Sequence, residues 1–184
     1  MTQTASAAPL EAWSHRVADV PERGLDVQRS ASPAELAIVA EALELEACEH
    51  LEASYRLAPA GGGRYRLTGD VGARVVQACV VTLEPVAQDI AIEIDEEFWP
   101  PELLPKSENG LDGEQEALAA VIAEPIRDGR LEAGRVIYEQ VATAIDPYPR
   151  KEGAELPPEA ARKDDDGGRE NPFAVLARLK PGSR

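Results

Sequence analysis

Apolar and polar residues alternate along much of the middle of the chain, with the period of two that half-buried strands show. The alternation runs through residues 51–57, resumes at 65–67, continues over 71–81, and is cleanest over 90–98, where isoleucines alternate with charged residues. Short turns rich in glycine or proline separate these runs. The pattern therefore predicts four strands in an antiparallel meander.

Several departures from this pattern carry local predictions. Gly69 and Gly72 interrupt the alternation around the third run, and glycines inside a strand suggest a bulge or a sharp bend. Pro85 follows the third run and is expected to close that strand. A shorter apolar and polar segment over residues 13–17 is compatible with an edge strand.

A first helix is predicted over residues 33–47. Ser32 and Glu35 have the spacing of a capping box, and Pro33 occupies the position that proline favours at the start of a helix. Apolar residues then recur every three or four positions and form one face.

The second half of the chain is less regular. Residues 102–116 have the composition of an exposed loop, and the apolar residues 117–126 are compatible with either a strand or a short helix. A turn at residues 128–129 precedes a second amphipathic helix over 131–145, which Pro147 stops. The fold class expected is α+β, with a curved antiparallel meander packed against two main helices.

The composition changes after residue 150. We expect one α+β domain over residues 1–150 and a disordered linker rich in charge, proline and glycine over 151–170. A short helix is expected over 171–184, capped by Asn171 and carrying Phe173 and Leu176 on its apolar side. This helix either folds back on its own domain or docks on a partner.

The charge of the chain narrows the possible partners. The net charge is −15, and residues 151–184 contribute nothing to it because their acidic and basic residues balance. An acidic body of this kind repels a phosphate backbone, so DNA is not expected as a ligand, and it attracts basic proteins. The acidity could also serve solubility alone.

The sequence offers little catalytic chemistry. Only His15 and His50 could supply an imidazole base, and no Gly-x-Ser-x-Gly motif is present. Cys79 is followed three positions later by Thr82 in place of a second cysteine, so Cys79 is expected to be a small buried apolar residue. We expect no enzyme activity, no cofactor and no metal.

A nuclease remains a separate hypothesis. It would need clustered carboxylates to hold Mg²⁺, and Asp89, Glu93 and Asp95 share one strand face by spacing. A solvated strand face is the alternative interpretation of the same residues. The N-terminus has no secretory pattern, no apolar run is long enough for a membrane span, and the two cysteines suit a reducing compartment. A cytoplasmic protein with no membrane contact is expected.

Three segments together resemble the YceD family, named for large ribosomal RNA subunit accumulation, and in particular its alphaproteobacterial type. They are the run Gln-Ala-Cys-Val-Val-Thr-Leu-Glu-Pro at 77–85, the turn at 128–129 with the helix that ends in Asp-Pro-Tyr-Pro at 146–149, and the terminal run 171–180. The motif positions are Cys79, Thr82, Leu83, Pro85, Asp146, Pro147, Tyr148 and Pro149.

The resemblance implies a role in the synthesis, processing or stability of 23S ribosomal RNA and implies no enzymatic activity. Genes of this family commonly lie beside the gene for ribosomal protein L32. Some members resemble a metal-binding version with a Cys-x-x-Cys, which this chain lacks at Thr82, so no metal role is carried over.

We expect a ribosome-biogenesis factor whose acidic domain engages a basic ribosomal protein such as L32. The alternative is direct binding of precursor 23S ribosomal RNA through the C-terminal tail and local basic sites. The residues expected to take part in binding are Arg150, Lys151, Phe173, Leu176, Arg178 and Lys180.

Overall fold

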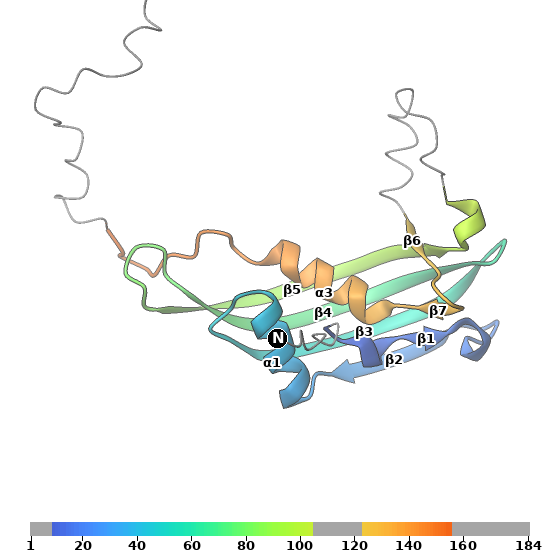
Figure 1. The fold of residues 1–184 in the computed structure, drawn as a ribbon, viewed down its shortest axis with the longest axis horizontal. Helices are drawn as coiled ribbons and strands as arrows, with labels where there is room; N and C mark the ends of the chain where they lie inside the picture. The colour runs from blue at the N-terminus through green and yellow to red at the C-terminus, as the bar shows by residue number, and fades with distance from the viewer. Residues whose placement is uncertain (1–8, 105–122, 156–184) are drawn as a thin grey trace, which may run out of the picture. The chain divides into compact units, whose positions relative to one another are not determined.

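Long antiparallel strands form the centre of the computed structural model, which describes residues 9–104 and 123–155 (Figure 1). These strands are β3 (Ala47–Gly61), β4 (Arg64–Ala78) and β5 (Pro85–Trp99). At one edge β2 (Leu25–Ser30) pairs antiparallel with β3, and at the other edge β6 (Ala123–Pro125) runs parallel to β5. The sheet order is β2-β3-β4-β5-β6. The described residues up to Lys151 belong to one compact unit.

Helices α1 (Pro33–Ala42) and α3 (Ala133–Ala144) lie over the same face of the sheet (Figure 1). The short strands β1 (His15–Arg16) and β7 (Arg130–Leu131) pair with each other antiparallel. One-turn 3₁₀ helices are present at Glu11–Trp13, Val17–Asp19 and Pro101–Leu103. Within the described ranges, no helix is long and apolar enough to cross a membrane.

The core lies between the sheet and these helices. The alternation predicted from the sequence places every second strand residue on this inner face. Leu57, Leu67 and Phe98 are fully buried there, one from each long strand, and Val39 of α1 and Ile137 of α3 are fully buried members of the same core from the helical side. The prediction of an α+β fold with a mostly antiparallel sheet and two main helices is confirmed.

The start of α1 is as predicted, but its end is not. Ser32 Oγ accepts a hydrogen bond from the Glu35 N–H, and Glu35 Oε2 accepts one from the Ser32 N–H at 2.8 Å, so the capping box is complete. The helix stops at Ala42, five residues before the predicted end. Glu44 adopts a left-handed conformation (φ 54°), which closes the helix in a C-terminal motif of the Schellman kind.

The predicted bulge at Gly69 and Gly72 is wrong. The predicted strands 65–67 and 71–81 are a single strand, β4, which stays in register with both neighbours through both glycines and ends at Ala78. A Cβ added at Gly69 would lie 2.3 Å from the backbone oxygen of Ser54 on β3. Glycine is therefore needed here for the close approach of two backbones, and not for a bend.

The N-terminal region differs from the prediction in two places. Strand β2 occupies an edge of the sheet where the sequence analysis proposed no element. The segment expected as an edge strand over residues 13–17 contains β1, but β1 pairs with β7 and not with the main sheet.

Some of the remaining predicted segments lie within the described residues, and others lie outside them. The turn at Asp128 and Gly129 is present, with φ values of 51° and 68°. The undecided segment 117–126 contains a strand, β6, in its described part. Most of the predicted loop over 102–116, most of the linker over 151–170 and the whole of the helix over 171–184 lie outside the described residues.

Candidate functional site

The hairpin between β4 and β5 closes through a loop that contains the first group of motif residues. Ala78 pairs with Pro85, and the Cys79 N–H donates to the Glu84 carbonyl at 2.8 Å. Within the loop, the Leu83 N–H donates to the Cys79 carbonyl at 2.9 Å. Leu83 has a left-handed backbone (φ 61°), which is uncommon for a residue other than glycine.

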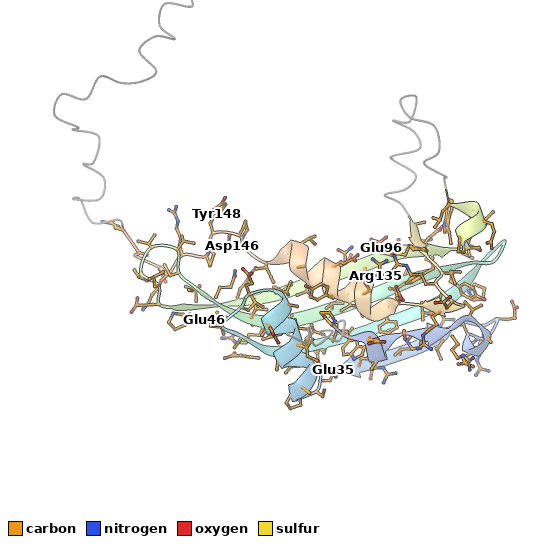
Figure 2. The ribbon with its side chains drawn as sticks, in the orientation of Figure 1. Glu35, Glu46, Glu96, Arg135, Asp146 and Tyr148 are labelled. Atoms are coloured by element: carbon orange, nitrogen blue, oxygen red, sulfur yellow. The ribbon has the colours of Figure 1, made fainter. Side chains whose placement is uncertain are left out.

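The second group of motif residues follows α3 and forms hydrogen bonds with this loop and with the end of β4. The Val80 N–H donates to the Pro149 carbonyl at 2.9 Å, and Gln77 Nε2 donates to the Asp146 carbonyl at 3.1 Å. Figure 2 shows Asp146 and Tyr148 beyond the end of α3. We call residues 79–84 together with residues 146–151 the motif junction.

The sulfur of Cys79 lies at the centre of the motif junction. Its Sγ accepts hydrogen bonds from the backbone N–H groups of Val81, Thr82 and Lys151, each at 3.4 Å. The side chain has no exposed surface, yet it is not part of the apolar core. Cys79 is thus buried, as expected, but it acts as a polar acceptor that joins two segments about seventy residues apart in the chain.

These donors stabilise the thiolate. They lower the pKa of Cys79 to about 6, the Lys151 N–H contributing most, followed by Thr82. Burial acts in the opposite direction and is outweighed by these hydrogen bonds. For comparison, burial on β3 raises the pKa of Cys48.

Two glutamines hold the end of α3 against the sheet. Gln88 Nε2 donates to the Ala144 carbonyl at 3.0 Å, and Gln88 Oε1 accepts from the Asp146 N–H at 3.0 Å. Gln77 binds the Asp146 carbonyl, as described above. Neither role was predicted from the sequence. The alternation of strand residues could have indicated them, because it places Gln77 and Gln88 on the inner face near the ends of their strands.

Two of the three carboxylates that a nuclease site would need form ion pairs instead. Asp89, Glu93 and Asp95 are exposed at alternate positions of β5, as predicted. Asp89 binds Arg74 at 2.7 Å, and Asp95 binds Arg66 at 2.6 Å. Among the described residues, no group of three or more His, Cys, Asp and Glu side chains is placed to hold a metal ion.

The two histidines lie in different surroundings. His15 Nε2 lies 2.7 Å from the Tyr55 hydroxyl between β1 and β3, and burial is the main cause that lowers the pKa of His15. His50 is exposed on β3 and lies 3.2 Å from Glu52.

The motif positions Cys79, Thr82 and Leu83 meet those at 146–149 in the motif junction, although the two groups are far apart in sequence, and Pro85 follows the junction as the first residue of β5. Of the expected binding residues, Arg150 is exposed at the junction and Lys151 binds Glu84 through Nζ at 3.0 Å. The other four, Phe173, Leu176, Arg178 and Lys180, lie outside the described residues.

A family model described as large ribosomal RNA subunit accumulation protein YceD matches residues 67–180. The chain belongs to the YceD family. The matched range contains both segments of the motif junction and excludes β2, α1 and β3. Searches of curated proteins and of solved structures found no match.

Membership in the YceD family links the chain to accumulation of the large-subunit ribosomal RNA. The family is associated with ribosome assembly and is not known as enzymatic. In this chain the Thr82 backbone N–H binds the sulfur of Cys79.

Proposed function

We propose that this YceD-family chain is a non-enzymatic ribosome-biogenesis factor that supports 23S ribosomal RNA by binding a basic large-subunit protein, such as L32, in the cytoplasm. The partner would contact the outer face of the sheet, on the side away from the helices. The proposal also includes that the chain is of the alphaproteobacterial type, which its three motif segments together resemble.

The ion pairs on the outer face are the observation that carries the proposal. Arg56, Arg66 and Arg74 point outward, and each binds a carboxylate on a neighbouring strand at 3.0 Å or less. A guanidinium already held in this way is poorly available to a phosphate. These three arginines therefore do not compensate the acidity of this face toward a nucleic acid.

Other carboxylates of the outer face have no such compensation. Asp70 on β4 and Glu93 on β5 are directly opposite in the sheet register. Neither forms an ion pair with another residue in the described ranges. Like charges directly opposite destabilise a sheet, so a basic side chain from a partner would relieve this repulsion.

The alternative, direct binding of precursor 23S ribosomal RNA through the C-terminal tail and local basic sites, has one supporting observation. Arg150 is exposed beside the exposed ring of Tyr148, and cationic and aromatic side chains together suit single-stranded RNA. Lys151 supports this version less, since Glu84 already binds its ammonium group.

The test compares two double variants of the full chain that change net charge equally. Asp70→Asn with Glu93→Gln removes the opposed carboxylates, whereas Glu41→Gln with Glu44→Gln neutralises exposed carboxylates at the end of α1. Affinity for purified L32 and other basic large-subunit proteins is measured at low and at high salt. We expect the first variant to bind about tenfold more weakly at low salt and nearly as wild type at high salt, because salt screens exposed charges.

The control variant should bind as wild type under both conditions. Equal affinity of all three proteins at low salt would contradict the proposal. Tight binding of precursor 23S ribosomal RNA, lost after removal of residues 171–184 and the change Arg150→Gln, would favour the alternative.

A further inference from the structure

Exposed apolar side chains gather at the motif junction. Among the described residues, four large apolar side chains are exposed, and three of them belong to this junction. They are Val80, Leu83 and Tyr148, with exposed fractions of 46%, 76% and 71%. Single exposed apolar residues are ordinary, but a group on one small surface indicates an interaction site.

The backbone of the junction presents these side chains from fixed positions. Val80 is bonded to Pro149, the neighbour of Tyr148, and the Leu83 N–H is bonded to the carbonyl of Cys79. The buried sulfur of Cys79 holds both segments together. The junction is thus held together by backbone groups and by the Cys79 sulfur, and these three apolar side chains are left in solvent.

Leu83 is the most informative member of the group. Its left-handed backbone costs about 1–2 kcal/mol relative to ordinary conformations, a cost that glycine would avoid. Its side chain is 76% exposed and contributes little to packing inside the unit. Strain that packing does not explain is a feature of functional positions.

We propose that Val80, Leu83 and Tyr148 form an apolar anchor that inserts into a pocket on the same basic large-subunit protein. This inference rests on the proposed function, and it adds a second contact with the partner to the one on the outer face of the sheet. Large apolar and aromatic side chains at the centre of an interface commonly supply most of the binding energy.

The anchor adjoins the acidic outer face of the sheet, which favours a basic protein over RNA. At the junction itself Glu84 pairs with Lys151, and Asp146 and Arg150 are exposed with opposite charges. The local charge is therefore balanced, and the carboxylates of the outer face attract a basic protein and repel a phosphate backbone. Three side chains are also too few for a stable interface of about 800 Å² per partner, so the anchor needs the outer face as an additional contact.

The two contacts lie on one continuous part of the sheet. Strand β4 leads from Asp70 to Ala78 at the junction, and β5 leads back from Pro85 to Glu93. Eight residues of strand span about 26 Å, so a single small protein could touch both contacts.

The test uses Leu83→Asn in the full chain. Asparagine has a similar size and tolerates the left-handed backbone, so the fold should be kept while the apolar group is lost. We expect affinity for basic large-subunit proteins to fall about tenfold at both low and high salt. A loss that is independent of salt distinguishes the anchor from the outer face, whose variant loses affinity only at low salt.

Two control variants separate the possible causes. Leu103→Asn removes an exposed leucine outside the junction, and Glu44→Asn changes another left-handed residue without removing an apolar group. Both should bind as wild type. A second anchor variant, Tyr148→Ser, should reproduce the loss seen for Leu83→Asn.

Three results would overturn the inference. Unchanged protein affinity in both anchor variants would do so, and the proposed function would survive if the outer-face variant still lost affinity. A loss of affinity for precursor ribosomal RNA alone would assign the surface to RNA. If removal of residues 171–184 raised the affinity of the wild type, and Leu83→Asn then had no effect, the occupant would be the chain's own C-terminal segment.

Discussion

Two segments are joined to the rest of the fold in opposite ways. The N-terminal junction, residues 10–16, is held by side chains that point inward, and Leu10 and Trp13 are each only 2% exposed. The motif junction is held by backbone groups and by the sulfur of Cys79. Its large apolar side chains, such as Leu83, remain in solvent.

The difference indicates which junction is available to a partner. The N-terminal junction has used its apolar groups for folding, and Trp13 Nε1 also donates to Glu35 of the capping box at 2.9 Å. Nothing large and apolar is left over among its described residues. In the motif junction, folding uses the backbone, so the side chains are free for recognition.

Each junction also contains a titratable group whose pKa is lowered, but the causes differ. Burial is the largest cause for His15, because a charged imidazole is poorly solvated there, and Arg29 and Arg130 add to the effect. Hydrogen bonds to the charged form are the cause for Cys79. Folding therefore favours a neutral histidine and an ionised cysteine.

The largest change in stability is expected from Gly134→Ala, which disrupts the packing of the N-terminal junction against α3. A Cβ at Gly134 would lie 2.1 Å from the Leu10 carbonyl oxygen, a backbone atom, and 2.9 Å from the Trp13 Cβ. Overpacking of this kind outweighs the gain in helix propensity, and we expect the free energy of unfolding to fall by about 2 kcal/mol. Urea denaturation measures the change, and tryptophan fluorescence should shift to the red as Trp13 becomes exposed.

A matched control exists on the outer face. A Cβ at Gly72 would meet only the flexible side chain of Glu52, at 3.7 Å, so Gly72→Ala should leave the free energy of unfolding nearly unchanged. If both variants were equally stable, the N-terminal junction would not depend on the close contact at Gly134.

The second effect concerns the pH dependence of stability at the motif junction. The pKa of Cys79 is about 6 in the folded protein and about 9 in the unfolded chain, so its contribution is fully present above pH 9 and is lost as pH falls to 6. We expect the free energy of unfolding to rise across this window in the wild type. The rise should be mostly absent in Cys79→Ala, which is measured by urea denaturation at a series of pH values.

Cys48→Ala is the control for this titration. Burial raises the pKa of Cys48 above its ordinary 9.0, so its thiol stays protonated in both states below about pH 8, and nearer pH 9 its ionisation in the unfolded chain can only lower stability and oppose the rise. Cys48→Ala should therefore keep the wild-type rise between pH 6 and 9. A rise that survives in Cys79→Ala would assign it to another group.

Much of the sheet and of α1 was accessible from the sequence because the signals are local. Ser32 and Glu35 are three residues apart, and the alternation in β3 and β5 needs only neighbouring positions. Strand β2 carries the same alternation from Leu25 onward, but the run is short and half exposed, which explains why it was missed.

The motif junction could be predicted only in part, because its chemistry depends on distant contacts. The motif residues were identified from the family resemblance, yet the role of Cys79 depends on the N–H of Lys151, 72 residues away. Gly69 was misinterpreted for the same reason, since the atom that requires a glycine belongs to Ser54 on the next strand. No spacing rule within one segment contains this information.

The smallest effect is expected at the N-terminal junction, from the titration of His15. Its pKa in the folded protein lies below the ordinary 6.5, so protonation favours the unfolded chain and stability falls as pH drops below 6.5. His15→Gln can keep a hydrogen bond to the Tyr55 hydroxyl, now 2.7 Å from Nε2, while removing the charge. We expect this variant to lose less stability than wild type between pH 6.5 and 5, as measured by urea denaturation at a series of pH values. Equal acid sensitivity in His15→Gln and wild type would show that burial at this junction does not control the titration, and the contrast between the two junctions would then rest on Cys79 alone.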